Sequence, residues 1–291
     1  MTPVLAIDLG GTRLRAGLAD LADAAPITPL GEWQAPQSPE AFRGRIGELL
    51  VKNGAARLGI GVPGLARGSV CTWIPNLGYL DGIDLAEWFP RVEIALGNDA
   101  QFSLLAEATA GAAAGLADVI LLAIGTGIGS AVLSGGSIVK GSRGGACSFG
   151  WASADMNDGG HERSGWLERH ASGRALDDAA GAIGLADGAA LITAARNGDV
   201  KALAALDPPM RALGTSLAGA VALLDPEIVV LSGGVAAAAD VVAPMILAAL
   251  RRHLPPHLRG IEIRPGQFGP AAGLTGAMIA GRKGADWGKL P

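Results

Sequence analysis

The chain has 291 residues, of which 49% are apolar and 17% are charged, so it is long enough for two domains and too apolar to be disordered. Its net charge of −4 and isoelectric point near 5.6 argue against nucleic acid or an anionic membrane as a partner. Cys71 and Cys147 are the two cysteines, and their wide separation excludes a disulfide framework and a CxxC metal site.

The first residues carry no signal of export. Met1 leads directly into a short strand, without a basic region or a long apolar region, so we expect no signal peptide. No apolar run reaches the roughly 20 residues that a membrane span needs. We therefore expect a cytoplasmic enzyme or binding protein with no membrane partner.

The first motif is a strand that ends in two glycines. Residues 4–9 form a buried strand, Gly10 and Gly11 predict a tight turn, and strand character resumes at residues 14–18. An ordinary β-hairpin explains this pattern, but Asp8 before the turn and Thr12 after it favour a second use. Glycine N–H groups and a threonine hydroxyl can bind phosphate oxygens, and a carboxylate can hold hydrated Mg²⁺. The spacing is neither that of a Walker loop nor that of GxGxxG.

The next segment supplies strands and helices that complete a first half. We expect an edge strand at 30–34, an amphipathic helix at 40–52, strands at 57–62 and 69–74, and a short helix at 84–89. The helix should turn Phe42, Ile46, Leu49 and Leu50 inward. Asn76 lies in a loop with proline and glycine, where asparagine is usually a turn residue. As a functional residue it would bind hydroxyl groups.

The sequence at Gly97-Asn-Asp-Ala100 is the strongest candidate for catalysis. A strand at 92–96 ends there, and a helix is expected from Ala100 to Gly115, with Gly115 as its C-cap. Asn98 or Asp99 could simply cap the helix. A helix cap explains one polar residue, but here two polar residues are adjacent at the carboxyl end of a strand. In open α/β sheets, this end of the strands is where ligands bind. We therefore predict that Asp99 is a general base.

The second half begins with the same pattern as the first. Residues 119–133 give a strand, a turn at Gly125-Thr-Gly127, and a strand, as residues 7–18 do. We interpret this as an approximate internal duplication, with two related domains that face a cleft. Two glycine hairpins that each carry a threonine predict phosphate binding more specifically than one of them would.

Most of the remaining chain is expected to be helical. We predict a glycine-rich loop at 140–150, one helix over 164–176, helices within 177–224, a strand at 228–235, a helix at 236–253, a strand at 261–264 and a helix at 271–280. Gly233 and Gly234 end the strand at 228–235, so their free N–H groups could receive a nucleotide. A plain turn between strand and helix is equally consistent with this pattern.

Six of these motifs occur in the order and spacing of a known family. The chain from Val4 to about Ala280 resembles the ROK family of sugar kinases, of the glucokinase and N-acetylmannosamine kinase type. The motifs are Asp8-Leu-Gly-Gly-Thr12, Gly61-Val-Pro-Gly64, Pro75-Asn-Leu-Gly78, Gly97-Asn-Asp-Ala100, Gly125-Thr-Gly-Ile-Gly129 and Leu231-Ser-Gly-Gly234.

The resemblance implies a two-domain α/β fold of the actin/hexokinase/Hsp70 (ribonuclease H-like) type, with a ligand cleft between the lobes. The N-terminal lobe would span 1–113 and be joined by the C-terminal helix 276–291, and the other lobe would span 114–275. It implies an ATP- and Mg²⁺-dependent kinase that acts on a sugar or cyclitol, as a cytoplasmic homodimer. A sugar-responsive regulator and a non-catalytic sugar- or nucleotide-binding protein are the alternatives.

The resemblance also assigns roles to individual residues. Asp99 would deprotonate the acceptor hydroxyl, and Asp8 would hold Mg²⁺ through water. The sugar side would comprise Gly64, Asn76, Asn98, Asp99, Ser148, Trp151 and Glu168. The nucleotide and its phosphates would lie against Asp8, Gly10, Gly11, Thr12, Arg13, Gly125, Thr126, Gly127, Gly233 and Gly234.

The sequence departs from the family at the sugar side and at the family's zinc site. Family members usually read Gly-Glu-Ile-Gly-His where this chain has Cys147-Ser-Phe-Gly-Trp151, and the segment at 159–166 lacks the family's cysteines. His161 alone cannot form a tetrahedral zinc site, so we expect no structural zinc. A changed set of polar partners changes which hydroxyls can be bound. The acceptor could therefore be a deoxy sugar, ketose, amino sugar or cyclitol.

Overall fold

The computed structural model describes residues 3–22 and 26–290, and the chain divides into two compact units. Residues 1–114, 136–146 and 270–291 form the first unit, and residues 115–135 and 147–269 form the second. Met1, from which the expected absence of a signal peptide was argued, lies outside the described residues. The sequence division assigned 136–146 and 270–275 to the second lobe, whereas by contact they group with the first unit.

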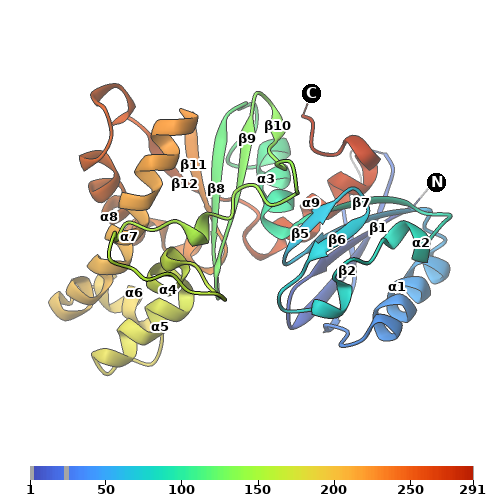
Figure 1. Ribbon diagram of the computed structural model, residues 1–291, viewed down its shortest axis with the longest axis horizontal. Helices are drawn as coiled ribbons and strands as arrows, with labels where there is room; N and C mark the ends of the chain where they lie inside the picture. Colours follow the sequence, from blue (N-terminus) through green and yellow to red (C-terminus); the bar gives the residue numbers. More distant parts are fainter. Residues whose placement is uncertain (1–2, 23–25, 291) are drawn as a thin grey trace. The chain divides into compact units, whose positions relative to one another are not determined.

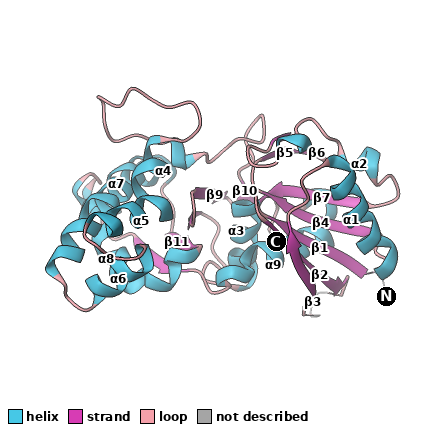
Figure 2. Cartoon of the chain, turned by 90° about the horizontal axis from the view of Figure 1, so that it is seen from below, coloured by secondary structure: helices cyan, strands magenta, loops and turns pink. Residues whose placement is uncertain are grey.

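The first unit is built on a five-stranded sheet (Figure 1), whose strands follow the order β3-β2-β1-β4-β7 (Figure 2). The strands are β1 Pro3–Leu9, β2 Arg13–Asp20, β3 Thr28–Gln34, β4 Arg57–Val62 and β7 Glu93–Asn98. Strand β1 is antiparallel to β2 and parallel to β4, and β4 is parallel to β7. The carboxyl ends of β1, β4 and β7 therefore meet at one edge of the sheet.

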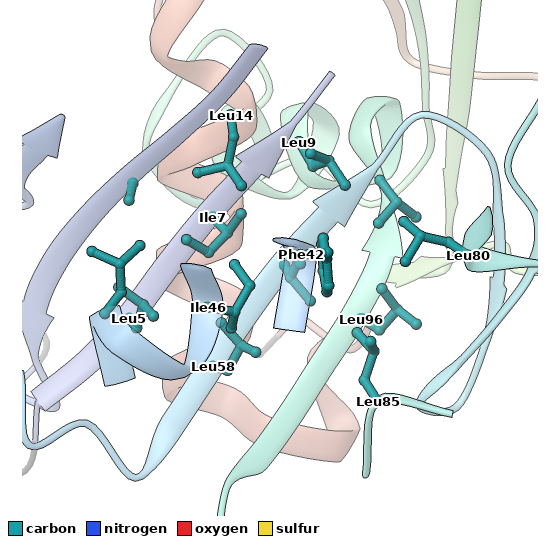
Figure 3. Close-up of a cluster of buried hydrophobic side chains, with 14 of the residues drawn as sticks. Leu5, Ile7, Leu9, Leu14, Phe42, Ile46, Leu58, Leu80, Leu85 and Leu96 are labelled. Atoms are coloured by element: carbon teal, nitrogen blue, oxygen red, sulfur yellow. The ribbon is translucent and has the colours of Figure 1, made fainter. Parts of the chain in front are cut away.

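Helices cover both faces of this sheet (Figure 2). Helix α1, Pro39–Asn53, buries the predicted Phe42, Ile46, Leu49 and Leu50. They form a core with Leu5, Ile7 and Leu9 of β1 (Figure 3). Because successive side chains of a strand point to opposite faces, Asp8 belongs to the other face. Helix α9, Ala272–Lys283, packs on β1 and β4 at that face, and α3, Asp99–Ala110, packs on α9.

Glycines let α9 approach its neighbours to backbone contact. A Cβ added at Gly276 would lie 1.8 Å from the carbonyl oxygen of Phe102 in α3. A Cβ added at Gly59 in β4 would lie 1.8 Å from the carbonyl oxygen of Ala277. No side chain fits at either position without moving a backbone, so these glycines set the distance between α9 and both partners.

Smaller elements complete the first unit. They are the two-stranded sheet of β5 Leu65–Arg67 and β6 Val70–Trp73, helix α2 Leu85–Trp88, strand β10 Ser137–Ile138, and 3₁₀ turns at Gly78–Leu80 and Gly284–Asp286. The end of α3 corrects a sequence prediction, because the helix stops at Ala110 and not near Gly115. The Glu107 carboxylate accepts a hydrogen bond from the N–H of Ala112 at 2.9 Å, which competes with a further helical turn.

The sheet of the second unit repeats the arrangement of the first. The sheet strands that belong to this unit run in the order β9-β8-β11-β12, with β8 Val119–Ile124, β9 Ile128–Ser134, β11 Ile228–Ser232 and β12 Glu262–Pro265. Strands β8 and β9 are antiparallel, and β8, β11 and β12 are parallel. This matches β2-β1-β4-β7 strand for strand, as the predicted duplication requires.

The helices of the second unit are α4 Trp166–Ala171, α5 Gly173–Ala182, α6 Gly188–Arg196, α7 Val200–Leu224 and α8 Ala239–Arg252, with short 3₁₀ turns at Phe149–Trp151, Gly234–Ala238, Pro256–Leu258 and Gly269–Ala271. The prediction of one helix over 164–176 was wrong, because the chain breaks at Ser172, whose backbone is extended. The N–H of Gly173 instead donates to the carbonyl of Gly125 at 2.7 Å. A tertiary hydrogen bond thus replaces a helical one.

One helical stretch, residues 234–252, is long and apolar enough to cross a membrane by length and composition. No apolar segment of that length was expected from the sequence. Within the second unit, however, α8 buries Val242, Ala243, Ile246, Ala249 and Leu250 and packs on α7 and β12. The stretch therefore packs as a core helix of this unit, and its composition is weak evidence for a membrane span.

Candidate active site

The carboxyl edge of the first sheet brings two carboxylates together. Asp8 lies near the end of β1, and Asp99 follows β7 directly as the first residue of α3. The register pairs Asp8 with Gly61 and Val62 with Asn98 across adjacent parallel strands. Residues that are far apart in sequence thus meet at the edge where α/β sheets bind ligands.

The environment of Asp99 favours its protonated form. Burial raises the pKa of Asp99 from 3.8 to about 6, and the negative charge of Asp8 acts in the same direction. The N–H of Ala100, which donates to Oδ1 of Asp99 at 2.7 Å, opposes the shift. Desolvation and like charge therefore outweigh the helix N-terminus, which by itself favours an anion. A carboxylate with this pKa is ionised at neutral pH and basic enough to accept a proton.

Asp8 lies between α9 and an arginine. A Cβ added at Gly273 in α9 would lie 2.8 Å from Oδ1 of Asp8, so this glycine leaves room for the carboxylate. Arg15 Nη1 lies 3.7 Å from the other carboxylate oxygen. Burial raises the pKa of Asp8, and the charge of Arg15 partly offsets that rise.

Sequence reasoning missed both Arg15 and Gly273. A signal for Arg15 was present in the hairpin, because the turn at Gly10 and Gly11 places Asp8 opposite Arg15. The role of Gly273 had no local signal. It depends on the packing of α9, which is 265 residues further along the chain than Asp8.

Asn98 is the N-cap of α3, which decides between the two cap candidates of the sequence, Asn98 and Asp99. Its Oδ1 accepts from the N–H of Ala100 at 2.9 Å, and Gln101 Oε1 accepts from the N–H of Asn98 at 3.1 Å, which completes a capping box. The side-chain Nδ2 donates to the carbonyl of Gly64 at 3.0 Å. Asn98 thus joins the loop at Gly64 to the start of α3.

The other candidates of the first unit lie beside this edge. The N–H of Gly10 donates to the carbonyl of Arg13 at 2.8 Å, which closes the predicted turn and leaves Thr12 exposed. A Cβ added at Gly11 would lie 3.0 Å from Cβ of Asn76, so the loop at Asn76 lies against the turn. Arg13 instead extends to Glu32, with Nη1 and Oε1 2.5 Å apart. The structure therefore pairs Arg13 with a carboxylate of β3.

In the second unit, the glycine hairpin lies at the carboxyl ends of β8 and β11. The N–H of Gly125 donates to the carbonyl of Gly127 at 3.0 Å, and Thr126 at the tip is exposed. A Cβ added at Gly233, whose φ is +76°, would lie 2.6 Å from the carbonyl oxygen of Ile124. Gly233 is therefore required by its backbone conformation and by close contact with β8. Gly234 follows it in a 3₁₀ turn, not directly in the predicted helix.

Glu168, which the resemblance assigned to sugar hydroxyls, supports this hairpin. Its Oε2 accepts from the N–H of Ile128 at 3.1 Å. A Cβ added at Gly127 would lie 2.6 Å from the same oxygen. One carboxylate oxygen of Glu168 is thus engaged with the end of the hairpin, immediately beside Gly127.

The segment that carries Ser148 and Trp151 is anchored on β9. The hydroxyl of Ser130 donates to the carbonyl of Cys147 and accepts from the N–H of Phe149. Cys147 has a φ of +66°, a conformation that favours glycine and is strained for other residues. The side chain of Ser148 is exposed, and Trp151 is 46% exposed. Both side chains are therefore accessible to solvent beside an anchored backbone.

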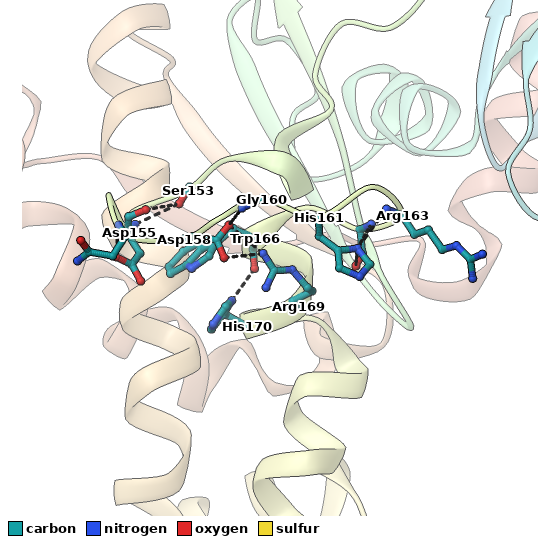
Figure 4. A network of polar contacts seen from close by, with 11 residues as sticks. Ser153, Asp155, Asp158, Gly160, His161, Arg163, Trp166, Arg169 and His170 are labelled. Carbon is teal, nitrogen blue, oxygen red and sulfur yellow. Dashed lines mark hydrogen bonds and ion pairs between the residues drawn. The ribbon is translucent and has the colours of Figure 1, made fainter.

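The loop after Trp151 is held by an ion pair (Figure 4). Arg169 Nη2 donates to both carboxylate oxygens of Asp158 at 2.8 and 2.9 Å, and this lowers the pKa of Asp158. His161 Nδ1 accepts from the N–H groups of Arg163 and Ser164 at 3.1 and 3.2 Å. Across residues 3–22 and 26–290, no group of three or more His, Cys, Asp or Glu side chains is placed to hold a metal ion.

Comparison with known proteins gives matches along nearly the whole chain. An N-acetylmannosamine kinase of Shigella flexneri is 32% identical over 289 residues, which cover 95% of this chain and 97% of the relative. An N-acetylgalactosamine kinase of Shewanella is 28% identical and covers 97% of each chain. A Streptomyces griseus ROK family glucokinase, solved in complex with glucose and AMPPNP, superposes with a TM-score of 0.79 at 26% identity over 97% of this chain and 100% of that one.

These matches and the duplicated sheets define a carbohydrate kinase with the actin/hexokinase-like fold. The sequence pattern of the ROK family matches residues 4–283. The chain therefore belongs to the ROK family, and the sequence-based prediction of the family and the fold is confirmed.

Proposed function

We propose that this carbohydrate kinase transfers the γ-phosphoryl group of ATP to a hydroxyl of a hexose or hexose-like polyol, with Asp99 as the general base. The position of Asp99 supports this role most strongly. It begins α3 at the carboxyl edge of the first sheet, and its carboxylate has a pKa of about 6 beside Asp8. The base needs only to accept the hydroxyl proton as the oxygen attacks phosphorus.

In this proposal Asp8 holds Mg²⁺ through water. Mg²⁺ usually keeps several waters and binds through one or two carboxylates together with the substrate phosphates. Asp8 suits that mode, because Gly273 leaves space beside its carboxylate and Arg15, which is 3.7 Å from it, donates its Nε to Glu32 at 3.2 Å. When bound, Mg²⁺ would neutralise charge on the phosphates.

We assign phosphate contacts to the two glycine hairpins. Gly10, Gly11 and Thr12 form a closed turn at the end of β1, and Gly125, Thr126 and Gly127 form the equivalent turn at the end of β8. Exposed threonine hydroxyls and backbone N–H groups at such turns bind phosphate oxygens. We assign Gly233 and Gly234, at the end of β11, to nucleotide binding. Arg13 pairs with Glu32, and we assign it to the edge of the nucleotide site.

We assign the acceptor to residues of both units. Asn98 donates from its side-chain amide to the carbonyl of Gly64, Asn76 is exposed beside Gly11, and both amides are groups that bind hydroxyls. Ser148 and Trp151 offer a hydroxyl and an aromatic face, and Glu168 a second carboxylate oxygen. The relatives named for N-acetylated hexosamines and for glucose make these the first acceptors to test.

The decisive experiment is a coupled assay of ADP release over hexoses, N-acetylhexosamines, ketoses and cyclitols, run with ATP and with polyphosphate. We expect one acceptor class to give turnover, and Asp99→Asn to lower kcat by about 10²-fold or more while the sugar still binds. Asp178→Asn, which alters an exposed carboxylate on α5, is the matched control and should retain activity. Near-normal turnover in Asp99→Asn would remove Asp99 from its role. No turnover on any acceptor, with ligand binding intact, would favour a non-catalytic binding protein.

A further inference from the structure

The first unit contains a cavity that the proposed function does not use. It has a volume of about 400 Å³ and lies beside the edge strand β7, between residues 66–69, residues 140–144 and the chain around Trp287. Its apolar wall includes Val92 and Ile94. None of the residues assigned above to sugar, phosphate or Mg²⁺ lines it. Its volume is within the range of small-molecule sites.

The charge of this cavity is positive. Among residues 3–22 and 26–290, Arg67 and Lys140 are the charged residues that line it and no carboxylate does, although the whole chain has a net charge of −4. Lys140 Nζ lies 3.9 Å from the ring centroid of Trp287 and makes no ion pair within the part of the chain that the structure describes. The neighbouring acid, Asp286, is paired with Lys289 at 3.0 Å. Half-buried Lys140 therefore has an aromatic partner, while the acid whose charge acts on it, Asp286, is hydrogen-bonded to another lysine.

Backbone packing holds these groups in place. A Cβ added at Gly288 would lie 2.9 Å from Cε of Lys140, so the chain at Gly288 lies directly against the lysine side chain. A Cβ added at Gly144 would lie 2.2 Å from the carbonyl oxygen of Ala66, and the φ of Gly144 is +75°. The N–H of Ile138 donates to the carbonyl of Gly288 at 2.7 Å. Close backbone contacts thus lie on both sides of Lys140.

We propose that this cavity binds a small organic anion that carries a phosphate group. Lys140 and Arg67 pair with the phosphate, and the uncharged part of the ligand packs against Val92 and Ile94. A phosphate ester carries close to two negative charges at neutral pH, which matches two cations without a carboxylate. This proposal does not rest on the proposed kinase function.

The cavity also contacts the start of α3. Gln101, which is 6% exposed, lines it and accepts the hydrogen bond from the N–H of Asn98 at 3.1 Å. A ligand in the cavity therefore touches the side chain that completes the capping box immediately before Asp99.

Trace acetylation with acetic anhydride, read by mass spectrometry, tests binding at Lys140 directly. The probes are inorganic phosphate, glucose 6-phosphate and uncharged glucose, all at one ionic strength. We expect glucose 6-phosphate to slow the labelling of Lys140 by about tenfold at ten times its Kd, with exposed Lys52 unaffected. Equal protection by inorganic phosphate assigns the site to the phosphate group alone, and protection by the ester only assigns it to a sugar phosphate. Unchanged labelling of Lys140 with every charged probe overturns the proposal.

Calorimetry with Lys140→Met gives the second test, because methionine keeps the apolar stem on Trp287 and removes the charge. We expect the affinity for the protecting probe to fall by about tenfold or more, and Lys52→Met, the matched control, to bind normally. Unchanged affinity in Lys140→Met overturns the proposal. If that variant does not fold, the labelling of the unaltered protein decides. Neither measurement depends on catalytic turnover. Both therefore still test binding in this cavity if the proposed kinase function is wrong.

Discussion

At the scale of single residues, Asp99 combines a structural position with an unfavourable environment. It begins a helix, where a carboxylate is normally stabilised, yet burial and the charge of Asp8 raise its pKa to about 6. Perturbed carboxylates of this kind occur preferentially at functional sites. The residue can therefore be tested in two ways, by its effect on rate and by its effect on stability.

The first test is the pH dependence of kcat/KM. If Asp99 must be ionised to accept a proton, kcat/KM should fall about tenfold per pH unit below pH 6 and reach a plateau above it. The measurement is the rate at limiting acceptor concentration, taken from about one pH unit below this pKa to about two units above it. A flat profile across that range would contradict the assignment of Asp99 as the base.

The second test is the stability of Asp99→Asn. The pKa of Asp99 is higher in the folded protein, about 6, than its ordinary value of 3.8. Its stabilising contribution is therefore complete at low pH and is lost as pH rises through about 6. The substituted amide keeps an oxygen for the N–H of Ala100 and carries no charge. We expect this variant to be more stable than the unaltered protein by about 1–3 kcal/mol at about pH 8 and by about half as much at about pH 5.

Urea denaturation at the two pH values measures this difference, with Asp178→Asn as the control that should show no pH-dependent gain. A variant that is destabilised at the higher pH would show that the ionised carboxylate is favourable in the fold. That result would contradict the pKa on which the catalytic role of Asp99 depends. A gain in stability together with a loss of activity would identify a site where function is favoured over stability.

At the scale of elements, the helix pair α3 and α9 positions the start of α3 against the sheet. Gly276 brings α9 to backbone contact with Phe102, and Phe102 packs edge-on against Trp287 with ring centroids 4.9 Å apart. Gly273 on the same helix faces Asp8. One face of α9 thus determines the packing of α3 and the space around Asp8.

Gly276→Ala tests this packing. The added Cβ would lie 1.8 Å from the carbonyl oxygen of Phe102, so the helices must separate, and we expect a loss of about 1–3 kcal/mol despite the better helix propensity of alanine. Gly219→Ala in α7 is the matched control, because its Cβ would meet nothing within 4 Å. That substitution should stabilise the protein by up to about 1 kcal/mol. Thermal denaturation of both variants measures the contrast, and equal stability of the two would contradict the close packing.

At the scale of the whole molecule, the chain folds one strand arrangement twice. Each unit has an antiparallel hairpin with a glycine turn, followed by two parallel strands on the far side of the first strand of the hairpin. The first unit is completed by residues 136–146 and 270–291, which return to it from later in the sequence. The cavity at Lys140 and the contact of Gly273 with Asp8 both depend on these returning segments.

The sequence by itself determined the elements whose signals are local. Period-two and period-3.6 patterns, glycine turns and the cap candidates Asn98 and Asp99 predicted β1, β2, β4, α1 and the start of α3, and the six motifs predicted the family. The tertiary structure decided what depends on distant residues. The end of α3 follows from a side-chain bond of Glu107, the break before α5 from the carbonyl of Gly125, and the environment of Asp8 from Arg15 and Gly273. Local patterns fix backbone preference, whereas burial, close contact and charge depend on which segments the fold brings together.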